Sequence, residues 1–197
     1  AAPRVTRGCS AAFFNCSAAI PGSREPGIVP GPATPLVAAL LGGLLRYPEA
    51  LARNQDALAR LPIADRTDAA LLDAMLDAAI SHQGLDSQGL LAILSGTQQY
   101  NRALTLIRAD AMRFSFHRRD DDAAGAVRAQ ALRDLDEFVA VLVTQPEIRA
   151  QLANALAALQ IEWTEAHAAE HARLAELDRS YTQRMMDLRE SASNLNI

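Results

Sequence analysis

No lysine occurs among the 197 residues, so all 19 basic side chains are arginines. Aromatic residues make up only 5% of the chain, and β-branched aliphatic residues are scarce, with 7 Val and 9 Ile against 40 Ala and 27 Leu. Because Ala and Leu favour helices and β-branched residues favour strands, this composition predicts an all-α fold. We interpret the missing lysine as genomic base composition, and we predict no function from it.

Long apolar runs and cysteines are rare as well. The sequence has no window of 18 apolar residues, which argues against a transmembrane helix. Its two cysteines, Cys9 and Cys16, are too few for a disulfide framework or a complete zinc site, and we interpret them as free thiols of a cytoplasmic protein. The chain begins at Ala1 without the pattern of a signal peptide, so we expect an excerpt from a longer protein.

The net charge is negative and unevenly distributed. Residues 1–35 carry three Arg and one Glu, whereas residues 36–197 carry 16 Arg and 22 acidic residues, a net charge of −6. Because nucleic-acid phosphates need clustered positive charge, strong direct binding of nucleic acid is not expected, and protein partners are favoured. Nucleophile elbows, glycine-rich phosphate loops and dinucleotide motifs are absent, so we predict neither a cofactor nor a catalytic residue.

Proline and glycine are concentrated near the start of the chain. Six of the nine prolines and four of the ten glycines fall in residues 1–35, where they disfavour both a helix and a central strand. This range is predicted to be a flexible linker. From Leu36 onward, apolar spacing predicts a helical bundle over residues 36–120, followed by a long helix and a C-terminal helical hairpin over residues 121–197.

The segment 67–80 has the clearest helical pattern in the predicted bundle. Asp68 lies outside its apolar stripe, which consists of Leu71, Leu72, Met75, Leu76, Ala79 and Ile80. A turn is predicted at 82–89, with Asp86 or Ser87 as the N-cap of the next helix. A further helix aligns the apolar residues Tyr100, Leu104, Ile107, Ala111 and Phe114.

Two Pro-Glu pairs follow apolar runs, in "LLRYPEALA" (44–52) and in "LVTQPEIRA" (142–150). A residue before proline is pushed out of the helical conformation, so each pair predicts the end of one helix and the start of another. The second pair places a boundary near residue 146. Gly42 and Gly43 each cost about 1 kcal/mol relative to Ala in a helix, which predicts close approach by a neighbouring helix.

The acidic run in "RRDDD" (118–122) has two interpretations, a metal site or helix capping. Capping is favoured because a helix follows at once, with Val127, Ala131, Leu135, Phe138 and Leu142 along one stripe.

The part of the chain after residue 146 is predicted to form a helical hairpin. Its first helix uses Ile148, Leu152, Ala155, Leu156 and Leu159, and its second, from near Thr164, uses Leu174, Leu177, Tyr181, Met185 and Leu188. Trp163 lies near the turn and is either a core residue or an interface anchor, with the core preferred.

One segment matches a catalytic pattern. "HAAEH" (167–171) has the H-x-x-E-H order of inverted zinc peptidases; His167 and His171, at i and i+4, could face one metal, and a hydrolase would use Glu170 beside them. A third ligand would have to come from the 26 residues that remain. We therefore prefer ordinary surface residues, and zinc hydrolysis stays as an alternative.

Three stretches together resemble a known family: "PLVAALLGGLLRYPEAL" (35–51), "ALLDAMLDAAISHQGLDSQGLLAIL" (70–94) and "VRAQALRDLDEFVAVLV…PEIRAQL" (127–152). Their order and spacing resemble the C-terminal helicase-binding domain of bacterial DNA primase over about residues 36–190. The resemblance implies a bundle similar to the helicase N-terminal domain, and a terminal hairpin that docks onto the hexameric replicative helicase. It also implies single-stranded-DNA-binding protein as a further partner.

The same resemblance implies that the zinc-binding and catalytic modules of the primase lie upstream, so this chain is not expected to make primers. No family motif identifies contact residues in the hairpin. We nominate an exposed face by its chemistry, and its members are Arg173, Arg179, Tyr181, Arg184, Met185 and Arg189. For the arginines the alternative is ordinary solvation with acidic neighbours on the same helix. A helical scaffold that self-associates through the hairpin remains a second functional alternative.

Overall fold

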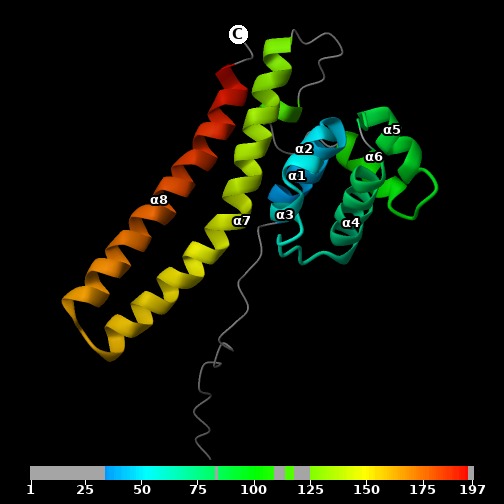
Figure 1. Ribbon diagram of the computed structural model, residues 1–197. Coiled ribbons are helices and arrows are strands. Elements are labelled where there is room, and N and C mark those ends of the chain that lie inside the picture. The colour runs from blue at the N-terminus through cyan, green and yellow to red at the C-terminus, as the bar shows by residue number, and fades with distance from the viewer. Residues whose placement is uncertain (1–33, 83, 109–113, 118–124, 195–197) are drawn as a thin grey trace, which may run out of the picture.

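The computed structural model describes residues 34–82, 84–108, 114–117 and 125–194, and every regular element in these ranges is helical, which confirms the all-α prediction. The elements in chain order, most of them labelled in Figure 1, are α1 (Thr34–Arg46), α2 (Glu49–Arg53), α3 (Gln55–Leu58), α4 (Arg66–Ser81), α5 (Ser87–Leu94), α6 (Tyr100–Arg108), the 3₁₀ turn η1 (Ser115–His117), α7 (Gly125–Ile161) and α8 (Glu165–Asn194).

Three predicted features lie wholly or partly outside the described residues. These are the acidic run at 118–122, most of the linker, including Cys9 and Cys16, and Ala111 of the helix predicted from Tyr100. Helix α1 begins at Thr34, two residues before the predicted start of the bundle. Within the described ranges, no helix combines the length and the apolar character that crossing a bilayer requires.

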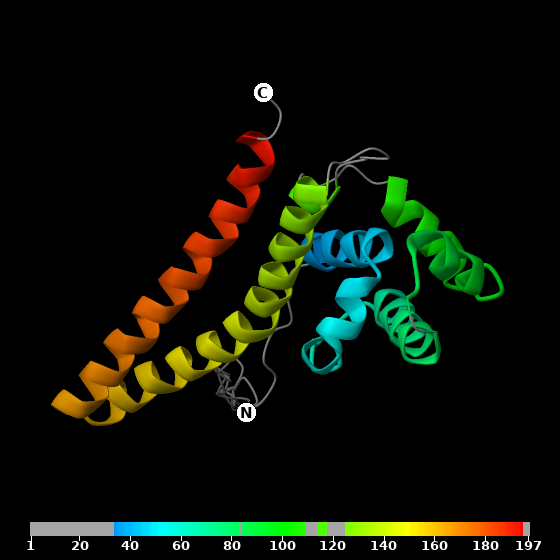
Figure 2. The ribbon, with the colours of Figure 1, turned by 45° about the horizontal axis from the view of Figure 1, so that its top comes forward.

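Helices α1 to α6 form a bundle that packs beside α7 (Figure 2), and α1 lies at the centre, in contact with α2, α4, α5, α6, η1 and α7. Apolar residues surround α1, so all its sides are buried; they include Val37, Ala39, Leu40, Leu41, Leu44 and Leu45. The predicted stripe of α4 faces the same core at Leu71, Leu72, Met75 and Leu76. Ile80, at the end of that stripe, is instead exposed.

Gly42 and Gly43 allow close packing against α1, and the neighbours come from α6, η1 and α7. A Cβ at Gly42 would lie 3.5 Å from the carbonyl oxygen of Leu106 in α6, as the predicted approach by a helix requires. At Gly43 the neighbours are side chains, with Cδ2 of Phe116 at 2.7 Å and Cδ1 of Leu135 at 3.0 Å from a built Cβ. The second glycine therefore makes room for an aromatic ring.

We expect Gly43→Ala to lower the free energy of unfolding by about 1 kcal/mol. Overpacking against the fully buried ring of Phe116 costs about 2 kcal/mol, and the better helix propensity of Ala returns about 1 kcal/mol. Gly125→Ala is the matched control, because nothing lies within 4 Å of a Cβ there. Urea unfolding followed by circular dichroism measures both, and a more stable Gly43→Ala protein would contradict the packing argument.

The two Pro-Glu pairs behave differently. The first prediction is confirmed, since α1 ends at Arg46 and α2 follows directly after Pro48. The predicted break at the second pair is wrong, because α7 is one helix of 37 residues with Pro146 inside it. Val143 and Ile148 are buried on either side of that proline, so packing continues across it and keeps the helix intact. The local preference of the pair is overridden by tertiary contacts.

Asp68, outside the apolar stripe of α4, is completely buried. Arg102 in α6 donates two hydrogen bonds to its carboxylate, from Nε at 2.7 Å and from Nη2 at 3.0 Å. A buried charge needs such a paired, hydrogen-bonded partner, and this contact ties α4 to α6. The neighbouring Asp65 has another role, because its carboxylate caps α4 by accepting from the N–H groups of Asp68 and Thr67.

These backbone N–H groups, that of Asp68 before that of Thr67, hold the pKa of Asp65 below its ordinary value of 3.8. A lowered folded-state pKa adds stability above the unfolded-state pKa, and this stability is lost as the pH falls through the folded-state pKa. We therefore expect Asp65→Asn, which keeps the cap but cannot titrate, to make the loss of stability below pH 3.8 shallower. Asp73→Asn, on an exposed position that caps no helix, is the control in acid titrations of the melting temperature.

Candidate functional site

The "HAAEH" segment lies at the start of α8. The ring Nδ1 of His167 is 3.0 Å from the carbonyl oxygen of Glu162, in the turn before the helix. Glu170 accepts two hydrogen bonds from Arg173, and this contact lowers the pKa of Glu170. Among the described residues, no three His, Cys, Asp or Glu side chains come close enough to hold a metal ion. The third ligand that zinc chemistry needs is thus not found in the described ranges.

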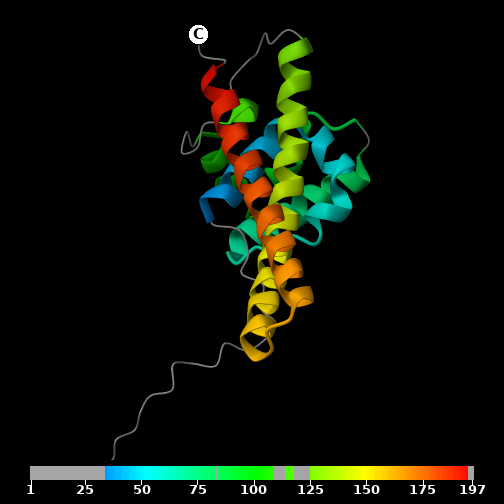
Figure 3. The ribbon, with the colours of Figure 1, turned by 90° about the vertical axis from the view of Figure 1, so that its left-hand side faces the viewer.

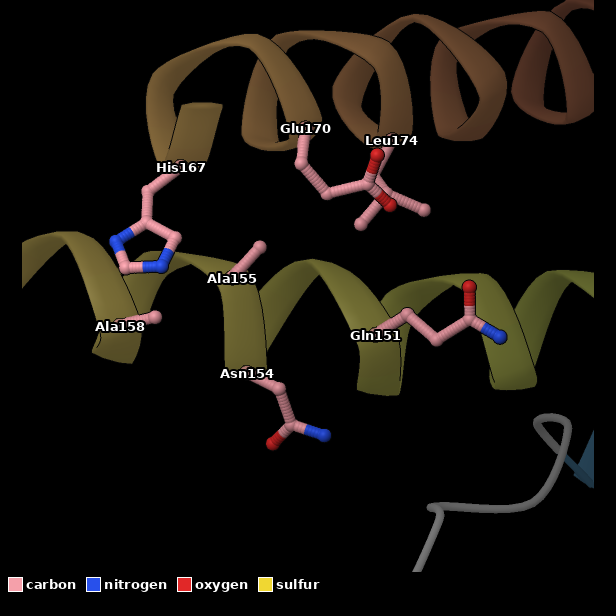
Figure 4. Close-up of a pocket in the computed structure, with 7 residues that line it drawn as sticks. All are labelled: Gln151, Asn154, Ala155, Ala158, His167, Glu170 and Leu174. Atoms are coloured by element: carbon pink, nitrogen blue, oxygen red, sulfur yellow. The ribbon is translucent and has the colours of Figure 1, made fainter. Parts of the chain in front are cut away.

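A shallow groove of 440 Å³ runs between α7 and α8 beside this segment (Figure 4). It is lined by Gln151, Asn154, Ala155, Ala158, His167, Glu170 and Leu174. Figure 4 shows the side chain of His167 pointing from α8 toward α7, where small alanine side chains face it. The lining contains no hydroxyl or thiol nucleophile, so the groove has the character of a packing gap between helices.

Three of the nominated arginines have acidic partners. Arg173 pairs with Glu170 at 2.6 Å and Arg179 with Glu176 at 2.6 Å, each one turn away on the same helix. Arg184 lies 3.4 Å from Glu137 of α7. These contacts agree with the alternative interpretation, in which the arginines are solvated and paired on the helix surface.

The remaining nominated residues divide between surface and core. The guanidinium carbon of Arg184 is 5.1 Å from the ring centre of Tyr181, which is half-buried against the body. Arg189 is exposed. Met185 is buried in the core cluster, so its nomination as part of an exposed face is wrong. The α8 stripe turns it toward α7 and the bundle, as the predicted apolar spacing of the same helix required.

The α7–α8 hairpin extends well past the bundle (Figures 1 and 3). The core of the body includes residues of α7 as far as Val143 and of α8 from Met185 onward. Beyond Pro146 the hairpin has two buried side chains, Ile148 and Leu174, and neither belongs to that core. We call this distal part, residues 147–178, the arm. Within the described part of the chain, the two helices of the arm stabilise mainly each other.

A polar cluster joins the two helices where the arm begins. Gln145 donates to Asp178 and to the hydroxyl of Thr182, at 3.3 and 3.1 Å. Arg149 donates to the same carboxylate of Asp178 at 2.9 Å. Gln145 and Arg149 flank Pro146 in sequence. Their contacts therefore hold α8 against α7 at the point where the proline interrupts the hydrogen bonds of the helix.

The tip of the arm exposes large apolar side chains. Ile161, the last residue of α7, is 89% exposed, and Trp163, in the following turn, is 78% exposed. The preferred core position for Trp163 is therefore wrong, because the turn lies beyond the reach of any core. Sequence reasoning missed its exposure, although Trp163 falls in "IEWTEA", between the two apolar stripes and among acidic residues.

The arm is strongly acidic. Residues 147–178 contain six acidic residues and two arginines, so their net charge is −4 with neutral histidines. Both arginines, Arg149 and Arg173, are paired with acids inside the arm. The surface that the arm offers to a partner is consequently acidic, and of the nominated residues it includes only Arg173.

Comparisons with known proteins do not extend this description: no protein-family model, curated protein or solved structure matches the chain.

Proposed function

We propose that this chain is a non-catalytic docking domain that attaches a DNA primase to the hexameric replicative helicase through its α7–α8 hairpin. The proposal rests on one observation, a two-helix arm that extends beyond the body core and ends in exposed Ile161 and Trp163. Exposed apolar groups of this size at one place are typical of protein interaction sites. The helicase as partner is supported by the resemblance of residues 36–190 to the primase domain.

The energetics of the arm also favour a binding role. With Ile148 and Leu174 as its buried side chains, the arm adds little apolar burial to the fold. Ordering its backbone costs conformational entropy on the order of 1–2 kcal/mol per residue. Burial of these two side chains offsets little of that cost. A chain selected for stability alone would have no use for such an extension. An extension that adds so little stability is explained by contact with a partner.

The test is calorimetric binding of the full chain to the helicase of the same organism. The comparison variant replaces residues 152–175 with Gly-Asn-Gly-Ser, which removes most of the arm but keeps the pairing of Arg149 with Asp178. Cutting the chain at residue 144 would not serve, because α8 contributes Met185 and Leu188 to the body core.

We expect binding by the full chain and none by the shortened chain, with the same melting behaviour of the body in circular dichroism. Equal binding by both would move the docking surface to the bundle. If neither binds, the primase assignment is rejected. Sedimentation of the free chain at rising concentration then tests the scaffold alternative, which predicts self-association that the shortened chain loses.

A further inference from the structure

We infer that the tip of the arm, formed by Ile161, Glu162, Trp163 and Glu165, is an anchor that fits an apolar pocket rimmed by Arg or Lys on a folded protein partner. The inference rests on the proposed function and specifies the surface and the chemistry of its contact. Three independent features of the tip carry it: the apolar side chains it displays, the rigidity of its turn and its charge.

The first feature is that the two apolar side chains do nothing for the fold. Ile161 and Trp163 are 89% and 78% exposed, and neither belongs to the core cluster. An exposed tryptophan gives up the large favourable free energy that burial of its side chain would supply. Tryptophan is also among the residues most enriched at the hot spots of protein interfaces. Their position at the end of a narrow arm suits insertion into a concave site better than contact with a flat one.

The second feature is the ordered turn. The N–H of Glu162 donates to the carbonyl of Ala158 at 2.9 Å, which closes α7. On the other side, the hydroxyl of Thr164 accepts from the N–H of His167 at 3.1 Å and caps α8. The ring of His167 also lies 3.0 Å from the carbonyl oxygen of Glu162. Trp163 is therefore presented on a fixed backbone, which lowers the entropy cost of binding.

The third feature is the charge beside the apolar pair. Glu162 and Glu165 are exposed, and neither has an ion-pair partner within the described part of the chain. The arm as a whole has a net charge of −4. Complementary charge on the partner guides association, so cationic side chains are expected around the pocket that receives Trp163.

The same charge argues against the other occupants. An anionic membrane surface attracts basic segments, and it would repel two unpaired carboxylates at the tip. Nucleic acid is repelled for the same reason. A second copy of the chain carries an identical acidic tip and a net charge of −4, so tip-to-tip association is opposed as well. An apolar pocket rimmed by basic side chains is the occupant that fits both the charge of the tip and its exposed Ile161 and Trp163.

Trp163 is the single tryptophan of the chain, so it reports on the tip directly. Chain labelled with 5-fluorotryptophan gives one ¹⁹F resonance, which is followed while unlabelled helicase is added. We expect the resonance to shift as the helicase binds. Trp163→Ala should weaken binding by about 30-fold or more, as removal of an interface hot spot does, without changing the melting temperature.

Two further variants separate the features. Glu162→Gln with Glu165→Gln should slow association by about tenfold at low salt and flatten its dependence on ionic strength. Ile80→Ala is the matched control, because Ile80 is also a large exposed apolar residue, 62% exposed, but lies on α4 in the body. It should leave the affinity unchanged.

The outcomes distinguish the inference from the proposed function. Binding that survives Trp163→Ala with an unmoved ¹⁹F resonance would overturn the anchor and leave the docking role in place. No binding by the unsubstituted chain would overturn both. A shift of the resonance on adding phosphatidylglycerol vesicles would replace the protein pocket with a membrane, and a shift on concentrating the chain alone would replace it with a second copy.

Discussion

Replacing Phe138 with alanine is expected to lower the free energy of unfolding by about 4 kcal/mol, the largest effect we predict for one substitution. Phe138 of α7 is fully buried, with its ring centre 4.7 Å from that of Phe114 and 5.4 Å from that of Phe116. Phe116 belongs to η1, which also packs against α1 at Gly43. The three rings therefore connect the bundle to the base of the hairpin.

The control for this prediction is Leu159→Ala, which removes a half-buried side chain from the arm. It should cost about 1 kcal/mol, because less apolar area is lost and solvent already reaches the site. Urea unfolding is followed by circular dichroism for the helices and by the fluorescence of Trp163 for the tip. A loss below about 1.5 kcal/mol for Phe138→Ala would show that the ring cluster does not join the two parts.

Apolar spacing was a reliable guide where a helix packs along one face. The segment 67–80 was predicted as a helix, and α4 spans Arg66–Ser81 with Leu71, Leu72, Met75 and Leu76 buried. The pattern is local, so it predicts the helix without knowledge of the elements that pack against it. The N-cap at Asp86 was equally predictable, because a short side chain with a hydrogen-bond acceptor just before a helix commonly caps its N-terminus.

The errors arose where a distant partner decides the outcome. Asp68 is buried because Arg102, 34 residues later, neutralises it, and the spacing within α4 does not show this. Pro146 does not end its helix because the packing of α7 continues across it, with Val143 and Ile148 buried on either side. Trp163 is exposed because both helices of the hairpin extend past the bundle, and the length of the helices relative to the bundle is not encoded by any single residue. The identity of the docking partner stays a prediction for the same reason.

Replacing Pro146 with alanine is expected to stabilise the chain by about 2 kcal/mol, since the roughly 3 kcal/mol cost of an interior proline is partly offset by the greater freedom of the unfolded chain. The substitution restores a hydrogen bond to the carbonyl of Leu142 and removes the ring that bends the helix. Figure 2 shows that α7 changes direction along its length. With about 22 Å of helix beyond the proline, loss of a 20° bend would move the tip by about 8 Å.

Electron–electron distance measurements detect that movement, using labels at Ala157→Cys in the arm and Asp77→Cys on α4, with Cys9 and Cys16 changed to serine. An unchanged distance distribution would contradict a proline-imposed bend.

Pro48→Ala is the matched control, and its expected effect has the opposite sign. Pro48 precedes α2 with φ at −60°, where no N–H is needed, so its loss should destabilise the chain by about 1 kcal/mol and leave the arm in place. A proline at the start of a helix is thus stabilising, whereas the proline inside α7 lowers stability. If the bend aims the tip, Pro146→Ala will yield a more stable chain that binds the helicase less tightly, and stability and docking will change in opposite directions.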